Sequence, residues 1–322
     1  VTPEAVVAST TAPPGAPAAG FTTAPPLSSA PGPGLASLAA TGMGGACNAG
    51  LPGPPAGTTL DRFLWTVGYF TANGFYVMLD NQFNLDQTAL RNPSLWVARW
   101  KELGARLAAD QPASLGKVLV DLLNEPDAWG LAWEARGGKP GMTGLYLAAM
   151  DALDGIYPFL YVIEGCGQAG LAKNWGDGIA TDAHLIASRG LSDPNPFFTT
   201  LLTKPYGGRV VAGPHIYGPS VARTTSDMTG PSFYKRLSQS FGYLNKAGYC
   251  PPAGGSCVRF PVLLGETGTG FLSWDDLQPQ MDLAAYAMAG RPGGGPPNPA
   301  ADDGLHNPLS GVFWWAWNAN GE

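Results

Sequence analysis

Short apolar runs that end in polar residues recur along the chain from residue 75 onward. The clearest is VLVDLLNEP at 118–126, where strand-forming residues stop at Asn124, Glu125 and Pro126. A run of this kind predicts a strand buried on both faces, as in a parallel sheet covered by helices. The same pattern predicts six strands, over residues 75–80, 118–126, 159–164, 210–217, 261–266 and 311–317.

Segments with apolar residues at helical spacing lie between these runs. Residues 59–74 predict an amphipathic helix that ends at Gly74, and further helices are expected over 93–110 and 145–153. Strands that alternate with helices form right-handed βαβ units, and the predicted fold class is therefore α/β, a (β/α)8 TIM barrel. Because only six of the eight barrel strands are predicted, we expect this chain to lack the first two strands and the last helix of the barrel.

Residues 1–58 differ from the rest in composition. They are dominated by Ala, Pro, Gly, Ser and Thr, and they show neither helical nor alternating periodicity. Such a segment cannot build a core, so it is expected to be a low-complexity tail or a long insertion at the barrel rim. Residues 59–322 are expected to form the barrel itself.

Charge and composition exclude several classes of partner. Charged residues make up 13% of the chain and the formal net charge is −6, so no basic field would attract nucleic acid or an anionic membrane. No apolar run reaches the roughly 18 residues that a membrane span needs. With three histidines and no His/Cys cluster, neither a metal site nor a cofactor is expected. A neutral substrate fits this composition best.

The four cysteines give one structural prediction. Cys250 and Cys257 bracket the loop PPAGGS at a spacing too wide for a redox or zinc CxxC pair. A local disulfide would stabilise this loop and would indicate an oxidising compartment, whereas two free surface thiols are the alternative. Cys166 is expected to be a small buried apolar residue, and the state of Cys47 stays open.

Two carboxylates share one setting in the predicted sheet. Glu125 follows an apolar run, and Glu266 ends the run at 261–266. The carboxyl ends of parallel strands meet at one rim, where α/β folds bind their ligands. Two carboxylates at that rim indicate acid/base or nucleophilic chemistry. The alternative is that both only cap strands or pair with arginine.

Four motifs close predicted strands in a specific order: NEP at 124–126, HIY at 215–217, GET at 265–267 and WWAWN at 314–318. In these motifs, residues 60–322 resemble an endoglucanase of glycoside hydrolase family five. The resemblance implies that residues 59–322 form a catalytic barrel. It implies further that Glu125, on strand four, is the general acid/base and that Glu266, on strand seven, is the nucleophile.

The resemblance also implies roles for neighbouring residues. Asn124 would contact the sugar 2-hydroxyl, and Trp315 would form the floor of the sugar subsite. His215 and Tyr217 would position the carboxylates. Alternate residues of a strand point to the same face, so His215 and Tyr217 can reach one site together. For His215 alone, an ordinary core histidine is the alternative.

Two departures from the family pattern concern the rim. Family members commonly carry His near the end of strand three, where this chain has Gln82, which can donate to a sugar hydroxyl but carries no charge. The family's strand-two arginine has no counterpart here.

Trp175 is a second candidate sugar platform, because aromatic faces suit sugar rings. One cleft is expected to hold Asn81, Gln82, Glu125, Trp175, His215, Tyr217, Glu266 and Trp315.

These patterns lead to one expected function and two alternatives. The expectation is a secreted retaining β-glycosidase that hydrolyses a β-1,4-linked polysaccharide, most simply an endo-β-1,4-glucanase. Retention requires the carboxyl groups of Glu125 and Glu266 to lie about 5 to 5.5 Å apart. The alternatives are an endo-β-mannanase and a noncatalytic carbohydrate-binding or cell-wall protein on a decayed hydrolase barrel. The oligomeric state stays open.

Overall fold

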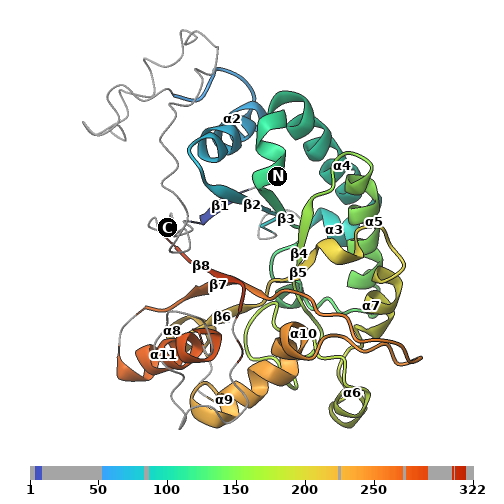
Figure 1. The fold of residues 1–322 in the computed structure, drawn as a ribbon, viewed down its shortest axis with the longest axis vertical. Coiled ribbons are helices and arrows are strands. Elements are labelled where there is room, and N and C mark those ends of the chain that lie inside the picture. The colour runs from blue at the N-terminus through green and yellow to red at the C-terminus, as the bar shows by residue number, and fades with distance from the viewer. Residues whose placement is uncertain are drawn as a thin grey trace.

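Strands lie at the centre of the molecule and helices lie outside them (Figure 1). The computed structural model describes residues 4–8, 53–82, 87–223, 226–270, 273–288, 307 and 309–316 of the 322-residue chain. One sheet contains, in spatial order, β1 (Glu4–Ala8), β2 (Tyr76–Asp80), β3 (Val118–Asp121), β4 (Leu160–Ile163) and β5 (Val210–Ala212). A second sheet contains β6 (His215–Tyr217), β7 (Leu263–Gly268) and β8 (Gly311–Trp314).

The fold is α/β, as the alternation of strands and helices predicts. Strands β2 to β5 are parallel and pair in sequence order, as do β6 to β8. A single parallel bridge between Ala212 and Val262 connects the two sheets. Within the described residues, β1 contacts β8 but no hydrogen-bonded ladder joins them.

The structure corrects two expectations about the strands. No strand was predicted in the first 58 residues, but β1 lies there and pairs antiparallel to β2. The stretch 210–217 was expected to be one strand, but it divides into β5 and β6, which belong to different sheets. The break falls at Gly213 and Pro214. Proline has no N–H for a ladder, and a Cβ on Gly213 would lie 2.3 Å from Val162 Cγ1.

The helices surround both sheets. They are α2 (Thr59–Ala72), α3 (Thr88–Arg91), α4 (Pro93–Asp110), α5 (Met142–Asp154), α6 (Ala183–Arg189), α7 (Asn195–Leu201), α8 (Pro219–Ala222), α9 (Gly230–Leu237), α10 (Tyr243–Lys246) and α11 (Trp274–Met288). Short 3-10 helices span Pro112–Lys117, Pro126–Trp129 and Gly207–Arg209, and one π-helical turn spans Ser238–Gly242. The three helices expected from apolar spacing correspond to α2, α4 and α5.

Local sequence explains where the two long helices of the first half begin. Thr58 and Asp61 form a reciprocal capping box at the start of α2. Asn92 caps α4 by accepting from Leu95 N, and Pro93 occupies the first helical turn. Each such cap stabilises its helix by about 1 kcal/mol. These signals in the local sequence fix where α2 and α4 begin.

The buried apolar side chains of the described residues form three clusters. The largest packs strands of both sheets against their helices and includes Trp96 and Trp100 of α4. A smaller cluster holds Met78, Val162, Val211 and Phe313, which come from strands of both sheets. This inner cluster packs the strands together below the rim that carries the polar residues.

The cysteine predictions are confirmed where the structure describes them. Cys250 and Cys257 form a disulfide, and Cys166 is a buried free thiol. Cys47 lies outside the described residues. Among the helices that the structure describes, none is both long and apolar enough to cross a membrane.

Candidate active site

The candidate acid/base and nucleophile come from different sheets. Glu266 lies inside β7 rather than at its end, directly beside its register partner His215 in β6. Glu125 lies beyond the end of β3 and immediately before the 3-10 helix Pro126–Trp129. Its backbone is left-handed, with φ 46° and ψ 56°, a conformation that costs a non-glycine residue about 1 to 3 kcal/mol. Strain of this kind is typical of a position where function decides the geometry.

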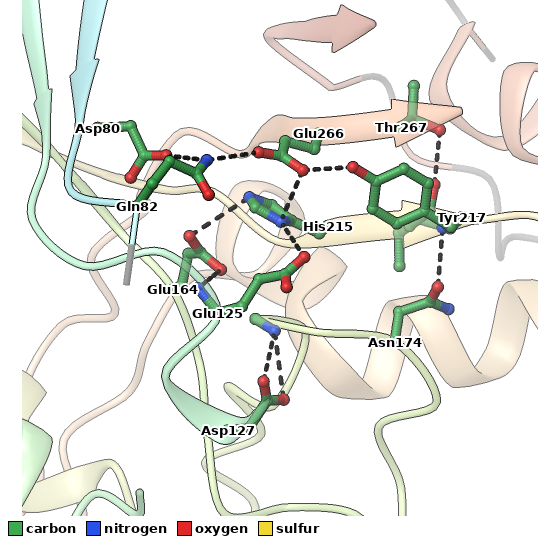
Figure 2. A network of polar contacts seen from close by, with 12 residues as sticks. Asp80, Gln82, Glu125, Asp127, Glu164, Asn174, His215, Tyr217, Glu266 and Thr267 are labelled. Atoms are coloured by element: carbon green, nitrogen blue, oxygen red, sulfur yellow. Dashed lines mark hydrogen bonds and ion pairs between the residues drawn. The ribbon is translucent and has the colours of Figure 1, made fainter. Parts of the chain in front are cut away.

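His215 lies between the two carboxylates (Figure 2). Its Nδ1 is 3.1 Å from Glu125 Oε1 and 3.5 Å from Glu266 Oε2. A carboxylate oxygen of Glu125 and one of Glu266 therefore lie within 4.8 Å of one another. The structure thus brings together the residues that the NEP, HIY and GET motifs supply. His215 is 1% exposed, and Glu125 is the more accessible of the two acids.

Two further side chains hold Glu266. The Tyr217 hydroxyl donates to Glu266 Oε2, and Gln82 Nε2 lies 3.4 Å from Oε1. Tyr217 is itself fixed, because its backbone N–H donates to Asn174 Oδ1 at 2.8 Å. Both oxygens of the candidate nucleophile therefore have donors, which favours the ionised form that nucleophilic attack requires.

The electrostatics of the pair follow from burial and from these contacts. Burial raises the pKa of Glu266 above its ordinary value, while His215 and the Tyr217 hydroxyl act to lower it. Burial lowers the pKa of His215, but Glu266 and Glu125 outweigh burial and raise that pKa to about 9. A protonated or proton-sharing imidazole between the two acids offsets part of their mutual repulsion.

The other predicted site residues differ in whether their side chains already have a partner. Asn124 is buried, and its Oδ1 has no hydrogen-bond partner among the described residues. Asn81 is also buried, but its Oδ1 accepts from Trp96 Nε1 at 2.8 Å, which explains Asn81 as a structural contact. The half-buried Trp175 meets the Tyr217 ring edge-on, with 5.9 Å between centroids.

Trp315 follows β8 directly. It is half-buried, and its backbone N–H donates to Thr267 O at 2.8 Å, so the residue continues the edge of the second sheet. Its neighbour Trp314 is 46% exposed. Trp317 lies outside the described residues. This placement leaves Trp315 beside the rim to which Glu266 belongs.

Three buried carboxylates beneath the site were not predicted from the sequence. Asp80 and Asp121 are register partners on β2 and β3, and Glu164 follows β4. Burial raises the pKa of Asp121 to about 7 and the pKa values of Asp80 and Glu164 well above the usual range. Asp80 and Glu164 each close an apolar run, the same signal that singled out Glu125 and Glu266, whereas Asp121 lies inside the run at 118–126. The family motifs assigned none of the three a role.

Among the residues that the structure describes, two groups of side chains have ligand atoms close enough for a metal ion, namely Asp121, Glu164 and His215, and Glu125, His215 and Glu266. Both groups depend on His215. Its two ring nitrogens already face carboxylate oxygens, Nδ1 toward Glu125 and Nε2 toward Glu164 at 3.3 Å. Contacts of the imidazole with these carboxylates therefore account for both groups without a metal ion.

Comparison with known proteins shows the fold. No family model matches the sequence, and no protein of curated function matches it. The catalytic domain of the major endoglucanase from Xanthomonas campestris pv. campestris has a TM-score of 0.54 and 21% identity, over 86% of this chain and 69% of that one. A hyperthermophilic endocellulase from Pyrococcus horikoshii has a TM-score of 0.50 and 16% identity, over 83% of this chain and 68% of that one. At these identities the similarity establishes a fold of the type found in these glycoside hydrolases.

Proposed function

We propose that this chain is a retaining β-glycosidase that hydrolyses β-1,4-linked polysaccharide, with endo-β-1,4-glucanase as the activity the site supports best. The observation that carries the proposal is the pair Glu125 and Glu266, whose carboxylate oxygens lie within 4.8 Å of one another on either side of His215. An oxygen–oxygen separation of at most 4.8 Å is compatible with the roughly 5 Å expected for retention, and it is shorter than the roughly 6.5 to 9.5 Å of an inverting pair.

In the proposed mechanism the two acids act in turn. Glu266 attacks the anomeric carbon while Glu125 gives its proton to the departing glycosidic oxygen, so that a glycosyl–enzyme ester forms and one sugar chain leaves. Glu125 then removes a proton from water, which attacks the same carbon and releases Glu266. The Tyr217 hydroxyl and Gln82 hold Glu266 in position for the first step.

The substrate class rests on chemistry around the pair. Asn124 offers a buried, unpartnered amide oxygen near the acid/base, which suits a sugar hydroxyl. The half-buried rings of Trp175 and Trp315 offer apolar faces for pyranose rings. These features suit a neutral glucan, and a β-mannan is the nearest alternative. The Cys250–Cys257 disulfide supports a secreted protein that acts on extracellular polysaccharide.

The experiment compares the parent protein with Glu125→Gln and Glu266→Gln on soluble β-1,4-glucans and β-mannans. Each substitution keeps the side-chain shape and is expected to lower kcat by about three decades, because it removes either proton transfer or the nucleophile. Proton NMR of the first product should show the β-anomer. The noncatalytic alternative is considered because Gln82 stands where family members commonly have histidine. A parent protein that binds these glycans without cleaving them would support that alternative.

A further inference from the structure

The carboxylate of Glu164 touches both parts of the proposed catalytic machinery without reaching the substrate. Its Oε1 is 3.3 Å from His215 Nε2, and its Oε2 accepts the backbone N–H of Glu125 at 3.0 Å. Glu164 is 0% exposed, so no sugar can contact it. Figure 2 shows it on the side of His215 that faces away from Glu266. The buried Glu164 side chain thus contacts the backbone of Glu125, the proposed acid/base, and the imidazole ring of His215.

The surrounding structure fixes Glu164 from several directions. Its backbone N–H and C=O both meet the Tyr146 hydroxyl at 3.0 Å. The loop that follows β4 returns Gly176 against the carboxylate, where a Cβ would lie 2.2 Å from Glu164 Oε2. Gly176 N–H donates to both Asp127 oxygens, at 3.2 and 3.3 Å, and so holds this loop against the 3-10 helix Pro126–Trp129. Gly176 therefore packs directly against the Glu164 carboxylate, with no space for a side chain at position 176.

These contacts have a consequence for the proton on His215. Glu164 Oε1 has no other hydrogen-bond partner among the described residues, and burial raises the pKa of this carboxyl well above its ordinary range. When the protonated carboxyl donates to Nε2, the proton of a neutral ring must lie on Nδ1, where it points at Glu125 and Glu266. Without that partner, the neutral ring could carry its proton on either nitrogen. The second contact acts on the backbone, since the Glu125 N–H bonded to Glu164 belongs to the residue with the strained left-handed conformation.

We propose that Glu164 is a positioning residue, which fixes the tautomer of His215 and the backbone of Glu125, so that both catalytic carboxylates meet a proton on Nδ1. The inference rests on the proposed function. The other ionisable groups around the ring are Asp121 from β3 and, next to it, Asp80 from β2. Neither has a described hydrogen bond or ion pair with His215, whereas Glu164 Oε1 lies 3.3 Å from Nε2.

Two substitutions separate this role from simple packing. In Glu164→Gln the amide can still accept from Glu125 N–H and donate to His215 Nε2, so both contacts persist. Glu164→Met has a similar length and volume but loses both contacts. Thr71→Val serves as a control for lost stability, because it removes a buried hydroxyl contact, 2.6 Å to Ser114, in α2.

The first measurement is a long-range proton–nitrogen NMR spectrum of the imidazoles, recorded above the pKa of His215 of about 9 so that the ring is neutral, with His215 assigned by a His215→Asn variant. The chain has only three histidines, so the spectrum is simple. We expect Nδ1 of His215 to carry a proton in the parent and in Glu164→Gln. In Glu164→Met we expect the nitrogen shifts of a mixture of tautomers.

The second measurement is steady-state kinetics on a soluble β-glucan. We expect Glu164→Gln to keep kcat within about tenfold of the parent, and Glu164→Met to fall at least about tenfold further, with KM nearly unchanged. Thr71→Val should lower the Tm and leave kcat alone. A folded Glu164→Met that keeps both the Nδ1 proton and the kcat of Glu164→Gln would overturn the inference. A parent that cleaves no glycan would refute the proposed function, while the NMR result would still decide the role of Glu164.

Discussion

Removing the Tyr217 hydroxyl tests how the site controls the ionisation of Glu266. In Tyr217→Phe the ring that meets Trp175 is retained, but Glu266 Oε2 loses the hydroxyl that donates to it. A hydrogen bond to a charged group contributes about 1.5 to 3 kcal/mol. If Glu266 must be ionised to attack, kcat/KM should fall by about 10- to 150-fold.

The pH profile gives the sign of the effect. The Tyr217 contact lowers the pKa of Glu266 and opposes the rise that burial causes. Without the hydroxyl that pKa rises further, so the protonated, inactive form persists to higher pH. The acid limb of the kcat/KM profile should therefore move upward by about one to two pH units.

A matched control is available elsewhere in the chain. Tyr206 is also buried, and its hydroxyl donates to Asp151 Oδ1 at 2.7 Å on the outer side of the first sheet. Tyr206→Phe removes the same atom from a similar contact, so it should change stability but neither kcat/KM nor the acid limb. The reasoning fails if Tyr217→Phe leaves the acid limb in place, or if both variants move it equally.

Two further predictions concern stability. Replacing Cys257 with Ser should lower the free energy of unfolding by about 2 to 3 kcal/mol, because the disulfide to Cys250 closes a short loop; chemical denaturation under non-reducing conditions checks this, and an unchanged midpoint would contradict it. Arg236→Met should cost about 3 to 5 kcal/mol, since it leaves the buried carboxylate of Asp177 without its cation at 3.0 Å. Thermal unfolding measures that loss, and a drop below about 1 kcal/mol, the size of a surface pair, would refute it.

The location of the site could be predicted from the sequence because it depends on strand ends. An apolar run that stops at a carboxylate marks the rim whatever the exact strand bounds are, and this held for Glu125, which lies beyond β3, and for Glu266, which lies inside β7. The limits of α2 and α4 were predicted to within two residues, whereas α5 begins three residues before the predicted start and the shorter helices were not predicted. Caps such as Asn92 act within one turn, so the local sequence contains the whole signal.

The parts that could not be predicted depend on contacts between distant residues. The strand β1 lies in a segment whose sequence has no periodicity, and its antiparallel pairing with β2 is a contact between distant residues that the local sequence does not show. The break between β5 and β6 arises because Gly213 packs on Val162, a residue of the neighbouring strand. Glu164 closes its run as Glu266 does, but its role becomes visible only when His215 Nε2 is found beside it.

The division of the strands into two sheets has a consequence for how activity arises during folding. Glu125 and Glu164 follow strands of the first sheet, whereas His215, Tyr217 and Glu266 belong to the second. Each sheet can form its own ladder and bury its own helices before the catalytic carboxylates face one another. On refolding from denaturant, the far-ultraviolet circular dichroism signal should therefore recover ahead of glycosidase activity, and simultaneous recovery would indicate that the sheets assemble in a single step. The proposed hydrolysis would then report a late stage of assembly, because it would be lost through docking defects that leave the secondary structure intact.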